Sequence, residues 1–410
     1  MEMNEISRRI GEQEVVDLAK RIVGFDTTNP PGNELECAEF LATVMGEIGL
    51  KTEVQVIDSS RANAVGYSSP QREGPTLLLE GHIDTAPLEL KERRLWLTDP
   101  FSGCVQNGRI FGKGIVDMKG GLTAILVAVK AVLKSGVDLK GNLKVAALAD
   151  ELGFMLGVKH FIKSGLADDV DGCISTEPIW GVQTTYGGRT WGKITVVGRS
   201  AVSNLDPTFA FKSGLGNNAI HQATRLLHEL ATKRPSHPTH SLFGRSWWHV
   251  LKISGGWDPE NTPMCPGTCE IVLEGRLVPG QSVSEFWKDV GGIIAKVQRK
   301  SPGFRAKVDV LERRPAYSVR ETHPLVRTVA NAYEEVIGRA PVMNPLGYPM
   351  NVTGDHHYFA AKGIPCVTIG PAEPRKIQAK QMFVANESLD IEKIIQTARI
   401  LVVAITRYLT

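Results

Sequence analysis

The sequence predicts an α/β protein in which a helix-covered, mostly parallel sheet is interrupted by a smaller α+β domain. Two observations predict the larger part: strand-like and helix-like segments alternate up to about residue 186, and several strands are nearly continuous apolar runs. A third observation predicts the insertion. From residue 187, alternating strands and amphipathic helices follow one another in the order β-α-β-β-α-β.

The first region begins with two segments of helical spacing, EVVDLAKRIVGF and LECAEFLATVMGEIG, separated by the Pro/Gly loop TTNPPGNE. The runs TEVQVI, TLLLEG and FGKGI are strand-like, and GLTAILVAVKAVLKSG has the pattern of a long buried helix. LKVAALA and DGCISTE predict two further strands, with the helix LGVKHFIKSG between them.

In the second region, WGKITVVGRS, HVLKISGG, TCEIVLEGRLV and AKVDVLERR are predicted strands, and NNAIHQATRLLHELAT and VSEFWKDVGGIIAKVQRK are predicted helices. From about residue 317, a helix, GDHHYF, the strand PCVTIG and the helix IEKIIQTARILVVAITRYL return to the first pattern. We therefore expect one domain from residues 1–186 and 317–410, and an inserted domain from residues 187–316.

Composition limits the possible partners. The 410 residues carry a formal charge of only +3 and no dense Lys/Arg tract, which argues against nucleic acid. No apolar run approaches the ~20 residues needed to span a bilayer, and the N-terminus lacks a signal-peptide core, so we expect a cytoplasmic protein without membrane contact. Six cysteines in such a long chain predict reduced thiols.

Acids and a histidine recur where predicted strands end. His82 and Asp84 follow TLLLEG, Glu151 follows LKVAALA, Glu177 follows DGCIST, and Asp117 lies between glycine turns in GKGIVDMKGG. Ligands sit at the carboxyl edge of open α/β sheets, where these side chains would meet. Helix caps or solvated turn acids would explain any one of them, but they explain the set poorly. Mixed His and carboxylate donors suit a divalent metal such as zinc or manganese.

These motifs resemble a known family. GHIDTAP, GKGIVDMKGG, ADELG, STEP, GRSAVSN, a segment ending in EGR, and GDHHYF followed by NESL occur in the order found in the metallo-hydrolases that include acetylornithine deacetylase, succinyl-diaminopimelate desuccinylase, aminoacylase and carboxypeptidase G. The resemblance implies a catalytic domain and a lid domain that usually dimerises the protein. It also implies that His82, Asp117 and Glu177 hold one metal, and that Asp84 accepts a hydrogen bond from the second nitrogen of His82.

The chain departs from the family at a second metal. The family's acid pair is Glu-Glu, a general base followed by a ligand. Here either Asp150 is the base and Glu151 the ligand, or Glu151 is the base and Leu152 occupies the ligand position. Phe383, four residues before Glu387, stands where the family has its other ligand for that metal. Two losses at one metal favour the second alternative, with a single divalent metal, manganese or zinc, in each subunit.

The lid motif is also changed. Val202 in GRSAVSN replaces a histidine that supports the oxyanion in the family, and loss of such a donor typically costs ~10²–10³ in the rate of acyl chemistry. Asn261 and Arg276 match lid positions that bind polar groups of the substrate. His356 and His357 in GDHHYF should lie near the site, where either one contacts substrate, replaces the lost donor or is structural.

A flat, apolar substrate accounts for these replacements. We expect Leu152, Phe383 and Val202 to seat an aromatic ring, whose amino group is displaced by water while charge spreads into an electron-poor ring. The pattern resembles the branch of 5-nitroanthranilic acid aminohydrolase. Two alternatives stay open: a deacylase or peptidase that acts on N-acyl amino acids with one metal, and a non-catalytic family member. In each case we expect a homodimer, or a larger homo-oligomer, formed through the lid domain.

Overall fold

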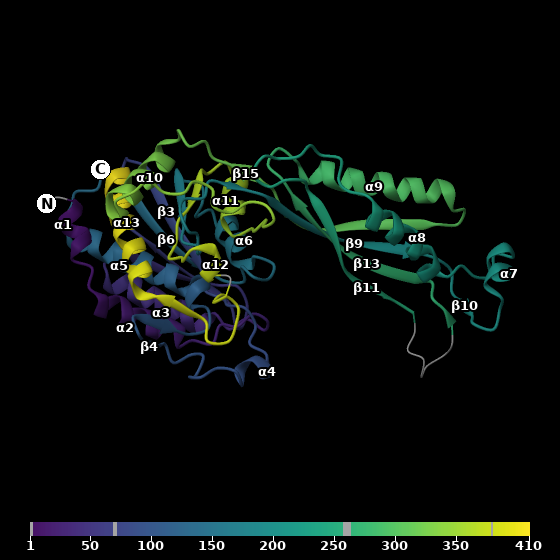
Figure 1. Ribbon diagram of the computed structural model, residues 1–410, viewed down its shortest axis with the longest axis horizontal. Coiled ribbons are helices and arrows are strands. Elements are labelled where there is room, and N and C mark those ends of the chain that lie inside the picture. Colours follow the sequence, from purple (N-terminus) through teal and green to yellow (C-terminus); the bar gives the residue numbers. More distant parts are fainter. Residues whose placement is uncertain (1–2, 69–71, 257–263, 379) are drawn as a thin grey trace. The chain divides into compact units, whose positions relative to one another are not determined.

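A computed structural model describes residues 3–68, 72–256, 264–378 and 380–410. The chain forms two compact units, which are considered separately below (Figure 1). Unit 1 comprises Met1–Thr184, Ser318–Leu346 and Gly354–Thr410, and unit 2 comprises Thr185–Tyr317 and Gly347–Thr353. No helix in the described part of the chain combines the length and the apolar character needed to cross a bilayer.

Unit 1 contains a six-stranded sheet with the strand order β1-β2-β6-β3-β7-β16. Its strands are β1 (Lys51–Val56), β2 (Ala62–Tyr67), β3 (Thr76–His82), β6 (Asn142–Leu148), β7 (Gly172–Ser175) and β16 (Cys366–Thr368). The pairs β6–β3, β3–β7 and β7–β16 are parallel, whereas β1 and β2 add an antiparallel edge. The prediction of a mostly parallel sheet is therefore confirmed.

The register of this sheet sets the position of the polar residues at its carboxyl edge. Every residue of β3 and of β6 is buried, as expected for strands covered on both faces. His82 pairs with Leu148, and Glu80 pairs with Ser175. The segments that follow β3, β6 and β7 consequently emerge next to one another.

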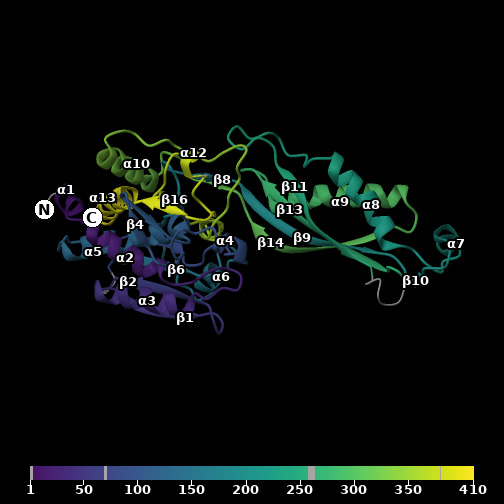
Figure 2. The same ribbon diagram turned by 60° about the horizontal axis from the view of Figure 1, so that its bottom comes forward.

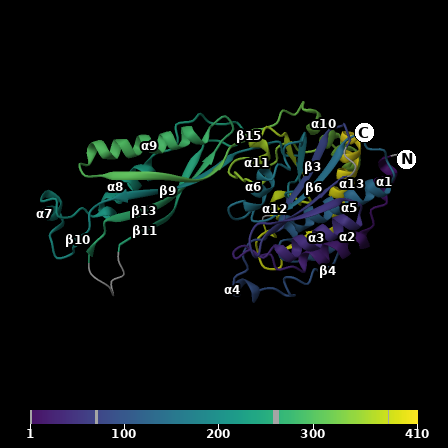
Figure 3. The same ribbon diagram turned by 180° about the vertical axis from the view of Figure 1, so that it is seen from behind.

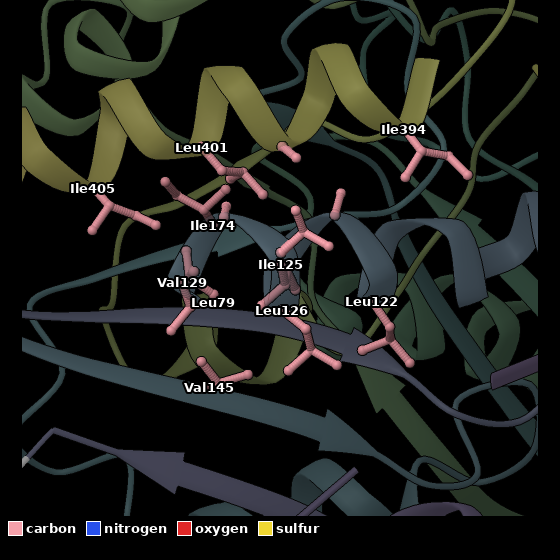
Figure 4. Packing of buried hydrophobic residues seen from close by; sticks show 14 of the residues in the cluster. Leu79, Leu122, Ile125, Leu126, Val129, Val145, Ile174, Ile394, Leu401 and Ile405 are labelled. Atoms are coloured by element: carbon pink, nitrogen blue, oxygen red, sulfur yellow. The ribbon is translucent and has the colours of Figure 1, made fainter. Parts of the chain in front are cut away.

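Two long helices cover the sheet, namely α5 (Gly120–Lys134) and α13 (Ile391–Leu409). Figure 4 shows α5 between α13 and strand β3, with Leu79, Ile125 and Leu401 in one apolar cluster. Burial of each such side chain contributes ~1.5–3 kcal/mol, so this packing holds the strands that carry the site.

Shorter elements complete unit 1. The other helices are α1 (Met3–Arg8), α2 (Glu12–Val23), α3 (Leu35–Glu47), α4 (Leu90–Arg93), α6 (Leu156–Lys163), α10 (Pro324–Ile337), α11 (His356–Ala361) and α12 (Arg375–Gln378). Helices α6 and α11 lie together (Figure 3), joined by an edge-to-face contact of Phe161 with Phe359. A small sheet contains β4 (Cys104–Gln106), β5 (Arg109–Phe111) and β17 (Ser388–Asp390).

The strand predicted at FGKGI is wrong in its extent. β5 ends at Phe111, and Gly114 adopts φ 79°, a left-handed conformation that cannot continue a strand. The chain then forms a tight turn at Ile115–Lys119 before α5 begins. Asp117 is consequently presented by a turn at the start of a helix.

Unit 2 is an antiparallel four-stranded sheet with the order β11-β13-β9-β14, covered on one face by helices α8 and α9 (Figure 2). Its elements are β9 (Gly188–Val197), β10 (Ala201–Val202), α7 (Pro207–Lys212), α8 (Ala219–Thr232), β11 (Trp247–Gly255), β12 (Met264–Cys265), β13 (Thr268–Leu277), α9 (Val283–Lys300) and β14 (Arg305–Arg314). The main elements follow the predicted β-α-β-β-α-β order. Short strands β8 (Thr185–Tyr186) and β15 (Tyr317–Ser318) occur where the chain passes between the units.

Candidate metal centre

Four of the predicted site residues converge at the carboxyl edge of the sheet in unit 1. His82 ends β3, Glu151 and Glu177 follow β6 and β7, and Asp117 lies in the turn before α5. Nε2 of His82 is 3.0 Å from Oδ1 of Asp117 and 3.9 Å from Oε1 of Glu177. One ligand atom from each of His82, Glu151 and Glu177 lies within 4.8 Å of the other two. Glu151 therefore belongs, with His82 and Glu177, to one group of possible metal donors.

The electrostatics of this cluster fit a bound cation. Burial, followed by repulsion from Asp117, raises the pKa of Glu177 well above its usual range. Burial also raises the pKa of Glu80, which lies two residues before His82 on β3, to about 7. The carboxylates of this cluster outnumber the neighbouring imidazoles, and a divalent cation would supply the compensating positive charge. The set of oxygen and nitrogen donors suits zinc or manganese.

A further buried acid faces the same centre. Asp355 is 1% exposed, and neither of its carboxylate oxygens has a hydrogen-bond partner among the described residues. Burial, followed by repulsion from Glu80 and Glu151, raises its pKa well above the usual range. A carboxylate of this kind is costly unless a proton or a cation neutralises it.

Asp84 contacts both His82 and the turn that follows β6. Nδ1 of His82 lies 2.8 Å from the main-chain oxygen of Asp84 and 3.4 Å from its carboxylate. Besides this contact with His82, the carboxylate accepts hydrogen bonds from the main-chain N–H of Glu151 at 2.9 Å, from that of Leu152 at 3.0 Å, and from the side chain of Asn29 at 2.9 Å. Asp84 therefore fixes the turn that presents Glu151 as well as the histidine.

The two adjacent acids after β6 point to different places. Asp150 adopts φ 64°, and its carboxylate accepts hydrogen bonds from Asn29 at 2.8 Å and from the main-chain N–H of Phe154 at 2.9 Å. It caps its own turn and is 2% exposed. Only Glu151 of the pair joins the group around His82. This arrangement favours the register in which Leu152 occupies the position of the missing ligand.

The three apolar replacements lie in both units. Leu152 is half-buried and Phe383 is 41% exposed, and neither side chain carries an atom that binds a hard cation. Val202 belongs to unit 2, where it is 50% exposed and lines a cavity of about 760 Å³ together with Met264 and Arg225. A shared ring pocket for the three residues stays a prediction.

The two histidines of GDHHYF are both buried. A β-carbon built on Gly354 would lie 2.8 Å from Nε2 of His356 and 3.0 Å from Oε1 of Glu177, so these two side chains face the same glycine. Nδ1 of His357 lies 3.1 Å from both the main-chain N and O of Gly354. His356 is thus placed beside the centre, and His357 stabilises the turn.

Of the two residues predicted to make polar contacts from the lid, Arg276 lies in the described part of the chain. In unit 2, Arg276 donates to the main-chain oxygen of Asn351 at 2.8 Å and to the carboxylate of Glu274 at 3.0 Å. These bonds occupy part of the fork that was expected to hold a substrate carboxylate. Asn261 lies outside the described residues. Both assignments stay predictions.

Sequence reasoning missed four residues that surround the centre. These are Asn29, Glu80, Asp355 and Glu387, all of them buried. Glu387 accepts a hydrogen bond from the main-chain N–H of Val116 at 2.9 Å and so steadies the turn that carries Asp117. An acid inside the otherwise apolar strand TLLLEGH was the one signal that could have identified Glu80.

Comparison with known proteins agrees with this geometry. The family model described as peptidase family M20/M25/M40 matches residues 78–407. An N-formyl-4-amino-5-aminomethyl-2-methylpyrimidine deformylase of Bacillus subtilis (strain 168) is 22% identical over 95% of this chain and 93% of its own length. A succinyl-diaminopimelate desuccinylase of Stenotrophomonas maltophilia (strain K279a) is 27% identical over 87% of this chain and 90% of its own length.

The fold is also found in solved structures. The crystal structure of the aminopeptidase PepT of Bacillus cereus ATCC 10987 matches with a TM-score of 0.74 and 16% identity, over 98% of this chain and all of that one. Because the family match spans most of the sequence and includes every strand end that carries a donor, the chain belongs to peptidase family M20/M25/M40 and is a metal-dependent hydrolase.

Proposed function

We propose that this protein hydrolyses a C–N bond with a single divalent metal, manganese or zinc, held by His82, Asp117 and Glu177. The observation that carries the proposal is the convergence of these three side chains with Glu151. The sequence adds that Leu152 and Phe383, at the two positions where the family has ligands for a second metal, offer no ligand. Three protein ligands leave open positions for water, as in catalytic rather than structural sites.

In this proposal Glu151 is the general base. When bound, the cation would act as a Lewis acid that lowers the pKa of water. The carboxylate of Glu151 takes a proton from the attacking water and returns it to the departing nitrogen. The carboxylate of Asp84 accepts a hydrogen bond from the main-chain N–H of Glu151, and its main-chain oxygen contacts Nδ1 of His82. One residue therefore positions both the base and a metal ligand.

The substrate that we favour is an electron-poor aromatic amine such as 5-nitroanthranilate, which would give the hydroxy-aromatic product and ammonia. The support comes from three apolar replacements, Leu152, Phe383 and Val202, which remove charge and an oxyanion donor. Negative charge that spreads into a nitro-substituted ring needs no lid histidine. His356 lies beside Glu177, where it could contact the ring substituents, and Arg276 and Asn261 are the proposed partners of the ring carboxylate.

Hydrolysis of an N-acyl group is the second candidate. It is favoured by the similarity, over nearly the whole chain, to a relative named as a deformylase of an aminomethylpyrimidine. That name describes a flat ring next to the acyl nitrogen, so the apolar replacements are compatible with it. The two candidates differ in the bond that is broken. Cleavage of the bond between ring and amino group releases ammonia, whereas cleavage of an N-acyl bond releases a carboxylic acid.

A three-substrate assay distinguishes them. Purified protein loaded with Mn²⁺ or with Zn²⁺ is given 5-nitroanthranilate, N-formyl-4-amino-5-aminomethyl-2-methylpyrimidine and N-succinyl-L,L-diaminopimelate, and ammonia, formate and succinate are measured. Ammonia from the first substrate supports the proposal. Formate or succinate release without ammonia supports the second candidate, and no product with either metal supports a non-catalytic member.

We also propose that residues 187–316 form a lid domain through which the chain makes a homodimer. In unit 2, the edge strand β11 exposes Val250, Leu251 and Ile253, at 38%, 55% and 51%. An exposed apolar sheet edge is a ready template for pairing with another strand. Sedimentation equilibrium of the full chain should give twice the monomer mass, and Leu251→Lys should lower it toward the monomer.

A further inference from the structure

One side chain joins the two acids that flank the proposed base. Asn29 lies in the Pro/Gly loop between α2 and α3 and is 7% exposed. Its side-chain nitrogen is 2.9 Å from Oδ2 of Asp84 and 2.8 Å from Oδ1 of Asp150. An asparagine amide carries two N–H donors, so each acid receives one of them.

The position of Asn29 is itself fixed by the strand that ends in His82. The main-chain N–H of Asn29 donates to the oxygen of Thr85 at 2.8 Å, and that of Thr85 donates back to Thr27 at 2.9 Å. The hydroxyl of Thr27 donates to the oxygen of Ile83 at 2.8 Å. The loop is therefore fastened to the chain beyond β3, and the amide cannot move independently of the metal centre.

Each acid that Asn29 holds in turn fixes one side of the Glu151 turn. Asp84 accepts from the main-chain N–H of Glu151 and Leu152, at 2.9 and 3.0 Å. Asp150 accepts from the N–H of Phe154 at 2.9 Å and, more weakly, from that of Leu156 at 3.3 Å. Both acids that the amide holds are therefore hydrogen-bonded to the backbone of the turn that carries Glu151.

We propose that Asn29 is a positioning residue that sets the orientation of Glu151 by holding Asp84 and Asp150 together. The inference rests on the proposed function in one respect, the role of Glu151 as the base. No more than about 6 Å separates the two carboxylate oxygens, because both are bound to one nitrogen, and buried like charges at that distance repel.

The charges around the amide explain why the residue is neutral. Arg61, just before β2, lies 3.8 Å from Asp150 and 3.9 Å from Glu34, and the buried Lys119 interacts electrostatically with Asp84. Among these charges, a donor without charge adds hydrogen bonds and no further repulsion. An aspartate at position 29 would have the same shape but could only accept.

Two substitutions separate positioning from packing. Asn29→Ala removes the amide, whereas Asn29→Asp keeps its volume and replaces donors by a third carboxylate. We expect kcat to fall by ~10–100-fold for Asn29→Ala, as for other supporting residues of metal sites, and further for Asn29→Asp. KM and the amount of Mn²⁺ bound at saturation should stay within about threefold of the wild type. The assay uses whichever of the three substrates above the wild type hydrolyses fastest.

The matched control is Asn142→Ala. Asn142 is also a buried asparagine, 9% exposed, whose amide donates to the oxygen of Arg72 at 2.9 Å. It begins β6, the same strand that leads to Glu151, but it lies at the opposite end. We expect Asn142→Ala to lower the free energy of unfolding about as much as Asn29→Ala does, but to leave kcat unchanged.

Hydrogen exchange tests the inference without any substrate. Amides of residues 150–156 should exchange faster in both Asn29 variants than in the wild type or in Asn142→Ala, because their acceptors are released. Unchanged exchange in this segment overturns the inference, and so does an Asn29→Asp variant that is milder than Asn29→Ala, since that order indicates packing.

A double-mutant cycle with Glu151→Gln separates this inference from the proposed function. If Asn29 acts through Glu151, Asn29→Ala should lower kcat by less than about twofold in the Glu151→Gln background. Full additivity overturns the inference. Should Glu151→Gln by itself retain turnover, the role of Glu151 as the base fails, while the exchange result still decides whether Asn29 holds the turn.

Discussion

Asp84 and Glu177 lie at the same edge of one sheet, and the pKa values of their carboxyl groups are shifted in opposite directions. Burial would raise the pKa of Asp84, but hydrogen bonds from His82, Asn29 and the Glu151 main chain lower it. We call Asp84 and Asp150 the inner acids. The outer acids are Asp117, Glu151 and Glu177. Burial, followed by repulsion from Asp117, raises the pKa of Glu177. The difference lies in the neighbours: hydrogen-bond donors surround the Asp84 carboxylate, whereas another acid, Asp117, lies close to the Glu177 carboxylate.

Replacing one acid from each group tests this contrast most strongly. Glu151→Gln should lower turnover by ~10²–10⁴-fold and leave Mn²⁺ binding intact, because an amide cannot accept the proton of water. Asp150→Asn should cost less, no more than the ~10–100-fold expected for Asn29→Ala, because Asp150 acts only through the turn. Steady-state kinetics and metal analysis of both variants provide the check. If Asp150→Asn is the crippling change and Glu151→Gln releases the metal, the assignment of base and ligand is reversed.

A second test adds two metal-binding side chains to the outer acids. Leu152→Glu with Phe383→His should restore a second metal, seen by anomalous scattering as two ions ~3.5–4 Å apart, whereas the wild type should show one. Turnover of 5-nitroanthranilate should fall by more than ~2–13-fold, the factor that loss of an aromatic contact worth ~0.5–1.5 kcal/mol gives alone, because charge and water also replace the apolar wall. Full activity of the double variant would mean that the apolar residues have no part in recognition.

The pH dependence of stability sharpens the contrast without mutation. Burial raises the pKa of Glu80 and of Glu387 to about 7, so the metal-free folded state binds more protons than the unfolded state between about pH 4.5 and 7. Its free energy of unfolding should therefore fall as pH rises through this window, by on the order of 1.4 kcal/mol per pH unit for each excess proton. Urea unfolding of chelator-treated protein measures this, and added Mn²⁺ should reduce the slope. A rise in stability with pH would contradict it.

The smallest effect is expected for the stability of the inner group. Asp150→Asn should cost about 1–3 kcal/mol, because one amide N–H would face donors that now bind a carboxylate. Asp138→Asn is the control, since Asp138 is an exposed acid paired with Arg72 and Lys140, and a change within ±0.5 kcal/mol is expected. Equal losses in the two variants would remove the structural role assigned to Asp150.

The sequence predicts the outer group much better than the inner one. His82, Glu151 and Glu177 each follow an apolar strand, and parallel strands bring their carboxyl ends to one edge whatever the loops do. Asn29 could not be found in this way, because its contacts depend on the path of a loop. The direction of Asp150 depends on one positive φ angle. Strand β2, with the composition ANAVGY, was also missed, since its small residues and glycine give no strong strand signal.

The insertion of unit 2 has a consequence for synthesis of the chain. His82 and the three outer acids all precede residue 185. Strand β16, which pairs with β7, and helix α13, which covers α5, come after residue 317. At ~5–20 residues per second, the ribosome needs roughly ten seconds or more to add the remaining residues. Throughout that interval the strands that carry the site lack their final cover, while unit 2, mostly one continuous segment, can fold. The nascent protein is therefore most exposed to aggregation, and most dependent on chaperones, at the apolar surface that α13 finally buries.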